Sequence, residues 1–124
     1  MVIYIALAVG GVLGVYARYG LTRLIQGLYG QGFPLATLIV NLLGTFLLAF
    51  IFVLTLERVT IAPAVRTGIM TGGLGAFTTF STFIMEALIL IEDGQAAKAA
   101  LYIALSVGLG VGAAFTAIYC ARGF

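Results

Sequence analysis

The chain has 124 residues, of which 63% are hydrophobic and only 8% are charged, and its formal net charge is +2. A soluble domain has about 25% charged residues, so the composition excludes an ordinary soluble protein and indicates a membrane protein. The small net charge gives no basis for nucleic-acid binding. With no histidine and one cysteine, Cys120, the chain has no internal disulfide or cysteine-based metal cluster, and we expect no enzyme.

Four apolar segments are each long enough to cross a bilayer. They cover approximately residues 3–25, 33–56, 62–91 and 96–121, and about 20 helical residues cross a hydrocarbon core of about 30 Å. Pro34 and Pro63 fall at the openings of the second and third segments, where a missing N–H costs nothing. The apolar N-terminus lacks a preceding basic region, so we interpret it as a retained helix. The sequence predicts an all-α membrane protein with one four-helix transmembrane domain over residues 1–124.

Polar side chains occur inside the first two segments. Arg18 lies several residues inside the first, so it either snorkels to the interface or faces protein and water, where it would keep a vestibule positive. Asn41 lies deep in the second segment and shares a helical face with Thr37. Two interpretations of Asn41 stay open: a hydrogen bond that joins two helices, or an NH2 group that donates to an anion.

The third segment contains the run GGLGAFTTFSTF at residues 72–83, with three glycines, four hydroxyl side chains and three phenylalanines. Irregular backbone survives in a membrane only against protein or a wet cavity, because each unpaired polar group costs several kcal/mol. We therefore predict that the third helix is broken near 72–79 and lines an ion path. If helix resumes after Thr79, the rings of Phe80 and Phe83 lie on one side. Their positive edges suit a small anion, although such spacing is more often simple packing.

Further polar groups follow in the last part of the chain. Glu86 lies one turn beyond Phe83, near the end of its span, so it is either functional or merely solvated. Tyr102 and Ser106 begin a stripe on the fourth helix that continues through small residues. Ser106 could instead bond its own i−4 carbonyl, as serine often does in membrane helices.

The charged residues give almost no orientation signal. Four spans place the N-terminus, the 57–61 connection and the C-terminus on one side of the membrane, which receives Arg58, Arg66 and Arg122. The other side receives Arg23 and Lys98, joined by Arg18 if it snorkels. Because four helices barely enclose a polar path, self-association is expected, and the balanced charge makes an antiparallel pair possible. A two-fold axis through the third helix would bring two copies of the 75–79 backbone together, where carbonyls could bind a cation.

Three motifs resemble those of the Fluc/CrcB-type fluoride channels, in order and across the whole chain. They are GGVLG at 10–14 followed by Arg18-Tyr19, NLLGTF at 41–46, and the run at 72–83. Val15 and Ala49 depart from the usual alanine and glycine, and both changes concern packing. Gly110 and Ala114 lack hydroxyls that some members carry there, so the extent of the polar track at that end is open.

The resemblance implies a fluoride-selective channel in the bacterial inner membrane, which exports cytoplasmic fluoride passively and protects the cell from its toxicity. It implies a dual-topology antiparallel homodimer with two anion pores. The pore residues that it implies are Asn41, Phe80 and Phe83, with a polar track of Thr37, Ser81, Thr82, Tyr102 and Ser106. Arg18 and Glu86 match vestibule positions. A structural sodium ion is implied on the two-fold axis, held by the backbone carbonyls of Gly75 and Thr78.

Two other functions remain open from the residues alone. A small proton-coupled exporter needs a protonatable group near mid-membrane, for which Glu86, close to an end, is the one candidate. A non-transporting accessory protein needs no more than the glycine motifs. A channel is favoured because fluoride, a small and strongly hydrated anion, needs many neutral donors without a fixed charge that would trap it.

Overall fold

A computed structural model describes residues 1–123 of the chain. Its helical segments, in order, are α1 (Val2–Tyr29), α2 (Leu35–Glu57), α3 (Pro63–Thr67), the π-helix η1 (Gly68–Leu74), α4 (Gly75–Phe77), α5 (Phe80–Glu92) and α6 (Ala96–Arg122). The described part of the chain contains no strand. Four stretches, α1, α2, Pro63–Glu92 and α6, are long and apolar enough to cross a membrane. The prediction of an all-helical chain with four spans is therefore confirmed.

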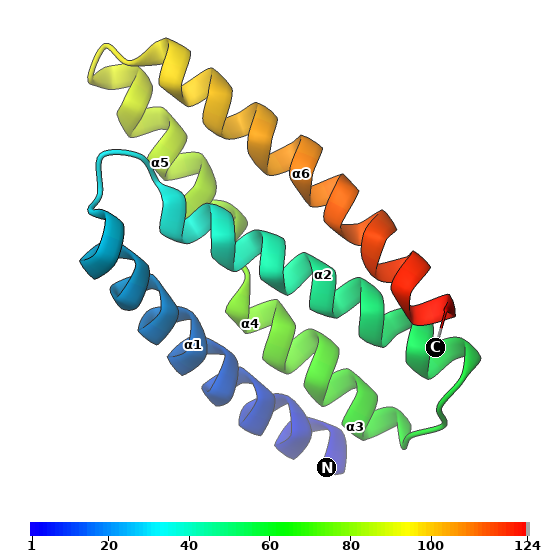
Figure 1. The fold of residues 1–124 in the computed structure, drawn as a ribbon. Coiled ribbons are helices and arrows are strands. Elements are labelled where there is room, and N and C mark those ends of the chain that lie inside the picture. Colours follow the sequence, from blue (N-terminus) through cyan, green and yellow to red (C-terminus); the bar gives the residue numbers. More distant parts are fainter. Residues whose placement is uncertain (124) are drawn as a thin grey trace.

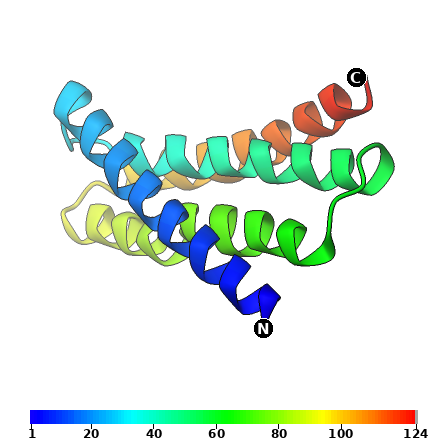
Figure 2. The ribbon, with the colours of Figure 1, turned by 90° about the horizontal axis from the view of Figure 1, so that it is seen from below.

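The helices form a small bundle in which α2 is central. Figure 1 shows α2 between α6 on one side and the α3–α4 part of the third span on the other, while α1 lies along α3–α4. Both termini lie toward the end of the molecule that carries the α2–α3 connection. Seen from below, α1 crosses the other helices obliquely (Figure 2). This crossing brings one half of α1 against the third span and leaves its other half to border polar cavities.

Glycines allow α1 to lie against the π-helix at backbone distance. A Cβ atom added to Gly10 would lie 2.1 Å from the carbonyl oxygen of Gly68, and one added to Gly14 would lie 2.2 Å from that of Gly73. Real Cβ atoms do not come so close, so only glycine fits at both positions. Such small-residue contacts let membrane helices pack tightly without a hydrophobic driving force.

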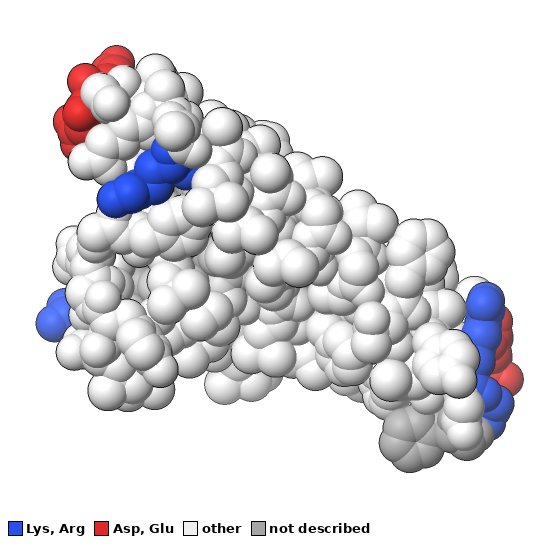
Figure 3. Space-filling view, turned by 45° about the horizontal axis from the view of Figure 1, so that its top comes forward, with Lys and Arg blue, Asp and Glu red and all other residues white. Residues whose placement is uncertain are grey.

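The buried cluster lies between α2, α5 and α6. Its members are Leu38, Phe83, Ala87, Leu90, Ala99 and Tyr102. On the face shown in Figure 3, charged residues gather at two opposite ends, with uncharged residues between them. At one end Arg122 forms an ion pair with Glu57 at 3.2 Å, which ties α6 to α2. This distribution fits a protein whose middle faces hydrocarbon.

The backbone of the third span differs from the expected break at 72–79. Gly68–Leu74 is π-helical and Gly75–Phe77 is α-helical, so the extended backbone is confined to Thr78 (ψ 159°) and Thr79 (ψ 118°). The glycines serve a different purpose: a Cβ at Gly72 would lie 2.8 Å from the carbonyl oxygen of Leu7 on α1. The extended backbone therefore lies at the end of the predicted region 72–79 and is shorter than expected, because residues 72–77 stay helical where α1 packs against them. π-helical turns are rare and occur often at functional sites.

Candidate functional site

Asn41 of α2 holds the extended residue Thr79 at both of its backbone groups. The N–H of Thr79 donates to Asn41 Oδ1 at 2.8 Å, and Asn41 Nδ2 donates to the carbonyl of Thr79 at 3.0 Å. The amide thus pairs with Thr79 as a neighbouring strand would, and it satisfies groups that would be costly to leave unpaired in a membrane. Asn41 therefore joins two helices, as one of the interpretations of the sequence proposed. An amide has two N–H donors, and the second stays available for another acceptor.

The hydroxyls of Thr78 and Thr79 form hydrogen bonds with backbone groups at the helix termini on either side of the extended backbone. Thr79 Oγ1 caps α5, where it accepts from the backbone N–H of Thr82 at 3.3 Å and lies 3.1 Å from Thr82 Oγ1. Thr78 Oγ1 donates to the carbonyl of Leu74 at 3.0 Å. Side-chain caps of this kind satisfy backbone groups that a helix leaves free at its termini.

Arg18 of α1 contacts the end of α4 from the opposite side. Its Nε donates to the carbonyl oxygen of Ala76 at 3.1 Å, and the residue is half-buried. A cation near a helix C-terminus is favourable, because the last carbonyls carry partial negative charge. Of the two expectations for Arg18, the structure supports the one in which the side chain faces protein and a cavity.

A polar cavity of about 210 Å³ lies between α1, α2 and α5. Its α1 wall carries Arg18, Thr22 and Gln26, which are four residues apart and therefore share one face of the helix. The α5 wall and the residue before it carry Thr79, Thr82 and Glu86, and α2 adds the buried Thr37. We call this space the inner cavity, and its walls combine hydroxyls, an amide, a guanidinium and one carboxylate.

A second cavity of about 330 Å³ adjoins the first toward the α1–α2 and α5–α6 connections. Its polar lining consists of Gln26, Gln31, Glu86, Asp93 and Gln95. We call it the outer cavity. Gln26 and Glu86 line both spaces, so they form the wall where the outer cavity meets the inner one.

A row of three aromatic rings extends from Glu86 through the buried cluster to the surface of the bundle. The hydroxyl of the fully buried Tyr102 donates to Glu86 Oε1 at 3.0 Å. The ring of Tyr102 meets that of Phe83 edge-on, with 5.1 Å between centroids, and Phe83 meets Phe80 at 5.9 Å. Phe80 is 74% exposed and Phe83 only 7%, so the two rings touch but occupy different environments in a single chain.

The structure brings some predicted site residues together and separates others. Those that line the inner cavity are Arg18, Thr37, Thr82 and Glu86. Asn41 bonds to the lining residue Thr79, and Thr78 is its neighbour in sequence. Phe83 and Tyr102 belong to the buried cluster. Phe80, Ser81 and Gly75 lie exposed on the surface of the single chain. Ser106 Oγ is buried and has no hydrogen-bond partner in residues 1–123, so it does not bond its own i−4 carbonyl.

Among the lining residues that sequence reasoning missed are two polar ones on the Arg18 face of α1, Thr22 and Gln26. Thr22 lies one turn beyond Arg18 and Gln26 two turns beyond it, on the same face of α1. The i, i+4, i+8 spacing was therefore the available signal. The spacing was ambiguous, because Gln26 lies at the edge of the predicted span, where a polar side chain needs no special explanation.

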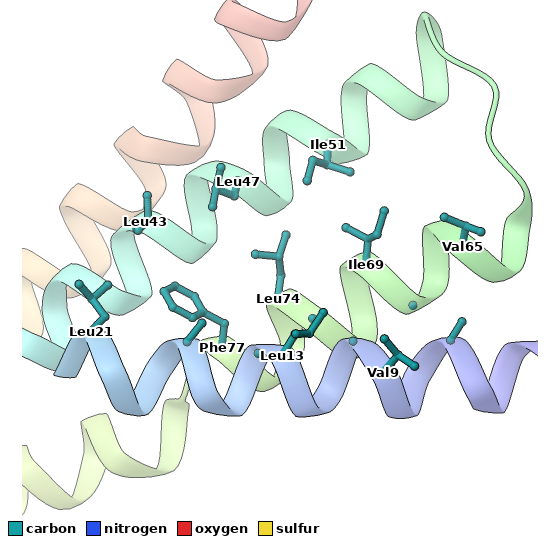
Figure 4. A pocket seen from close by; sticks show the side chains of 16 residues that line it. Val9, Leu13, Leu21, Leu43, Leu47, Ile51, Val65, Ile69, Leu74 and Phe77 are labelled. Atoms are coloured by element: carbon teal, nitrogen blue, oxygen red, sulfur yellow. The ribbon is translucent and has the colours of Figure 1, made fainter. Parts of the chain in front are cut away.

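An apolar groove of about 800 Å³ lies on the opposite face of α1. Figure 4 shows its labelled side chains, among them Leu13, Leu47 and Ile69, arranged around the space between α1, α2 and the third span. Gly10, Gly14, Gly68 and Gly73 also line it. The groove is open to the outside of the single chain and offers no polar side chain to an ion.

Comparison with known proteins finds similarity over almost the whole chain. Residues 5–118 match the family model described as CrcB-like protein, Camphor Resistance (CrcB). The fluoride-specific ion channel FluC of Acidithiobacillus ferrooxidans is 56% identical over 109 residues, 88% of this chain and 87% of that protein. FluC 1 of Moorella thermoacetica is 45% identical over 120 residues, 97% and 86% of the two chains. FluC of Thermus thermophilus is 46% identical over 112 residues, 90% and 89% of the two.

Proposed function

This chain belongs to the CrcB family, and on that premise we propose that it is a fluoride-selective ion channel that exports fluoride passively across the bacterial inner membrane. It is a multi-pass membrane protein. The observation that carries the proposal is the inner cavity, which ends at the extended backbone that Asn41 holds. The amide, hydroxyls and guanidinium around it are donors, which a small anion needs in place of its water.

The conducting form is an antiparallel homodimer of dual topology, in which a second copy of the chain completes each of two pores. Support comes from the exposure of Phe80 and Ser81, pore candidates that one chain leaves uncovered. The open apolar groove offers a surface for a second membrane helix, and the balanced charge of the two sides allows both orientations. In this dimer the edges of Phe80 and Phe83 contact the anion, and Thr37, Ser81, Thr82, Tyr102 and Ser106 continue its polar path.

A structural sodium ion between the two chains is the proposed cofactor, held by the carbonyls of Gly75 and Thr78. The donor chemistry fits, because carbonyl oxygens at an interrupted helix are the ligands by which membrane proteins hold Na⁺. There is also room: Gly75 is exposed, and a Cβ placed there would meet no neighbouring atom closer than the Met70 carbonyl oxygen at 3.7 Å. The ion would contribute positive charge where carbonyl dipoles of two chains converge. Thr78 and Gly75 alone cannot surround an ion, so this site needs both chains.

The decisive experiment reconstitutes the purified protein in liposomes and follows fluoride and chloride efflux, with the voltage clamped by a potassium ionophore. Fast efflux of fluoride alone, without a proton gradient, is the expected result. Efflux that stops when the proton gradient is removed, or that Glu86→Gln alone abolishes, would instead indicate a proton-coupled exporter. Intact dimers without any flux would indicate an accessory role.

The sodium site has a separate test. Exhaustive removal of sodium should inhibit fluoride efflux slowly. Gly75→Val should reduce the fraction of cross-linked dimer, because the valine side chain would enter the proposed sodium site. Gly20→Val is the matched control, since a Cβ at Gly20 meets nothing within 4 Å. Unchanged dimer and unchanged efflux after sodium removal would contradict the site.

A further inference from the structure

Gln26 is the one α1 residue that borders both polar cavities. It lies two turns beyond Arg18, and it shares its place between the cavities with Glu86 of α5. An anion that crossed from the outer cavity into the inner one along the residues they share would meet both an amide and a carboxylate. The family motifs identified in the sequence do not include this position.

The chemistry of the outer cavity makes this passage unfavourable for an anion unless donors are supplied. Its two acidic side chains, Glu86 and Asp93, repel negative charge, and the cationic Arg18 borders only the inner cavity. The neutral donors of the outer cavity are the amides of Gln26, Gln31 and Gln95. Each primary amide offers two N–H groups and no fixed charge, which suits an ion that must be bound and then released.

We propose that Gln26 is a further anion-binding residue of the conduction path, whose amide binds the partly dehydrated anion where the two cavities meet. This inference rests on the proposed function and adds a step to it. Glu86 lines the same region, and its carboxylate offers acceptors but no donor. Its Oε1 already accepts a hydrogen bond from the Tyr102 hydroxyl. The N–H groups of the Gln26 amide donate to the anion. These hydrogen bonds offset the repulsion between the anion and the Glu86 carboxylate, and they replace water molecules that the anion loses from its hydration shell. Arg18 and Thr22, on the same face of α1, then receive the ion in the inner cavity.

The test compares the same substitution at two glutamines. Gln26→Glu replaces donors with a carboxylate at the passage, whereas Gln31→Glu makes the identical change in a residue that borders the outer cavity only. Loss of a hydrogen bond to a charged group corresponds to a change of about tenfold or more. We therefore expect Gln26→Glu to lower fluoride efflux from liposomes about tenfold or more, and Gln31→Glu to change it less than twofold.

Two more variants separate donor chemistry from structure. Gln26→Leu removes the donors without adding charge and should also lower fluoride efflux, whereas Gln26→Asn keeps an NH2 group and should restore part of it. The fluoride concentration at half-maximal efflux should rise in Gln26→Leu, an effect that lower protein stability alone would not produce. Size-exclusion elution of each variant shows whether it remains folded.

Three outcomes would overturn the inference. Efflux within twofold of wild type in both Gln26→Glu and Gln26→Leu would show that the amide is not used. Equal losses of fluoride efflux in Gln26→Glu and Gln31→Glu would show that added negative charge anywhere along the outer cavity causes the effect. Wild-type protein without fluoride efflux would remove the proposed function and this inference together, whereas a conducting wild type with unaffected variants removes only this one.

Discussion

The two faces of α1 border two very different spaces. On one face, Gly10, Gly14 and their neighbours line an apolar groove of about 800 Å³. On the other, Arg18, Thr22 and Gln26 line an inner cavity of about 210 Å³ with polar walls. The helix itself is regular along both, so the difference comes from its side chains and from the helices that each face meets. One face is suited to contact with helices, and the other is suited to an ion.

In this short chain, one helix serves both helix packing and contact with an ion, on opposite faces. The groove face tolerates no added volume where backbones touch, while the cavity face needs particular donors and tolerates changes of size. Variants on the groove face should therefore act through sterics, and variants on the cavity face should act through lost hydrogen bonds. Variants on the two faces test this contrast, and their expected effects on stability differ in size.

The largest effect is expected from Gly10→Ala on the groove face. Its Cβ would lie 2.1 Å from the carbonyl oxygen of Gly68, so α1 must move away from the π-helix. Overpacking typically costs about 1–3 kcal/mol, and a clash with backbone belongs at or above the upper end. The midpoint of thermal unfolding in detergent should fall strongly. Gly11→Ala is the matched control, because a Cβ at Gly11 meets nothing within 4 Å; equal losses in both variants would contradict the contact.

A loss of comparable size is expected from Asn41→Leu at the end of the inner cavity. It leaves the N–H and carbonyl of Thr79 without their partner, at about 1–3 kcal/mol for each unsatisfied group. Hydrogen–deuterium exchange at Thr79 should accelerate, fluoride efflux should be lost, and exchange in α6 should stay unchanged. Slow exchange at Thr79 in this variant would refute the role of Asn41 as its partner.

Arg18→Gln should affect stability less and transport clearly. The variant loses a charge at the end of α4, a contribution of about 0.3–1 kcal/mol, while its amide can still donate to Ala76. Fluoride efflux should fall several-fold, since the inner cavity loses its cation. Arg23→Gln provides the comparison, because Arg23 is exposed and its side chain donates to the Tyr19 hydroxyl. Similar efflux in the two variants would show that position along α1 is unimportant.

The smallest effect on stability is expected from Phe80→Ile, because this ring is 74% exposed. The free energy of unfolding should change by no more than about 0.5 kcal/mol, as for a surface substitution. Fluoride efflux should nevertheless be abolished or sharply slowed if the ring edge contacts the anion in the dimer. Phe83→Ile, in the buried cluster, should reduce both stability and efflux. Wild-type efflux in both variants would end the ring-edge hypothesis.

Much of this contrast was predictable from particular residues. Asn41 and the run at 72–83 stand out because polar and irregular sequence is costly in a membrane, and the structure places both at one point. The extent of the extended backbone was not predictable. Glycines permit either an unwound segment or a close helix contact, and only the position of α1 decides between them.

The amino-acid sequence by itself determined the four apolar helices, because the length and hydropathy of each span follow from local composition. It also determined which polar side chains lie inside them. The tertiary structure decided which of these meet: Arg18 with Ala76, and Tyr102 with Glu86. It also decided that Gln26 and Glu86 line the same two cavities. Helical periodicity assigns a residue to a face of its own helix, but the crossing of α1 over the third span determines what that face meets.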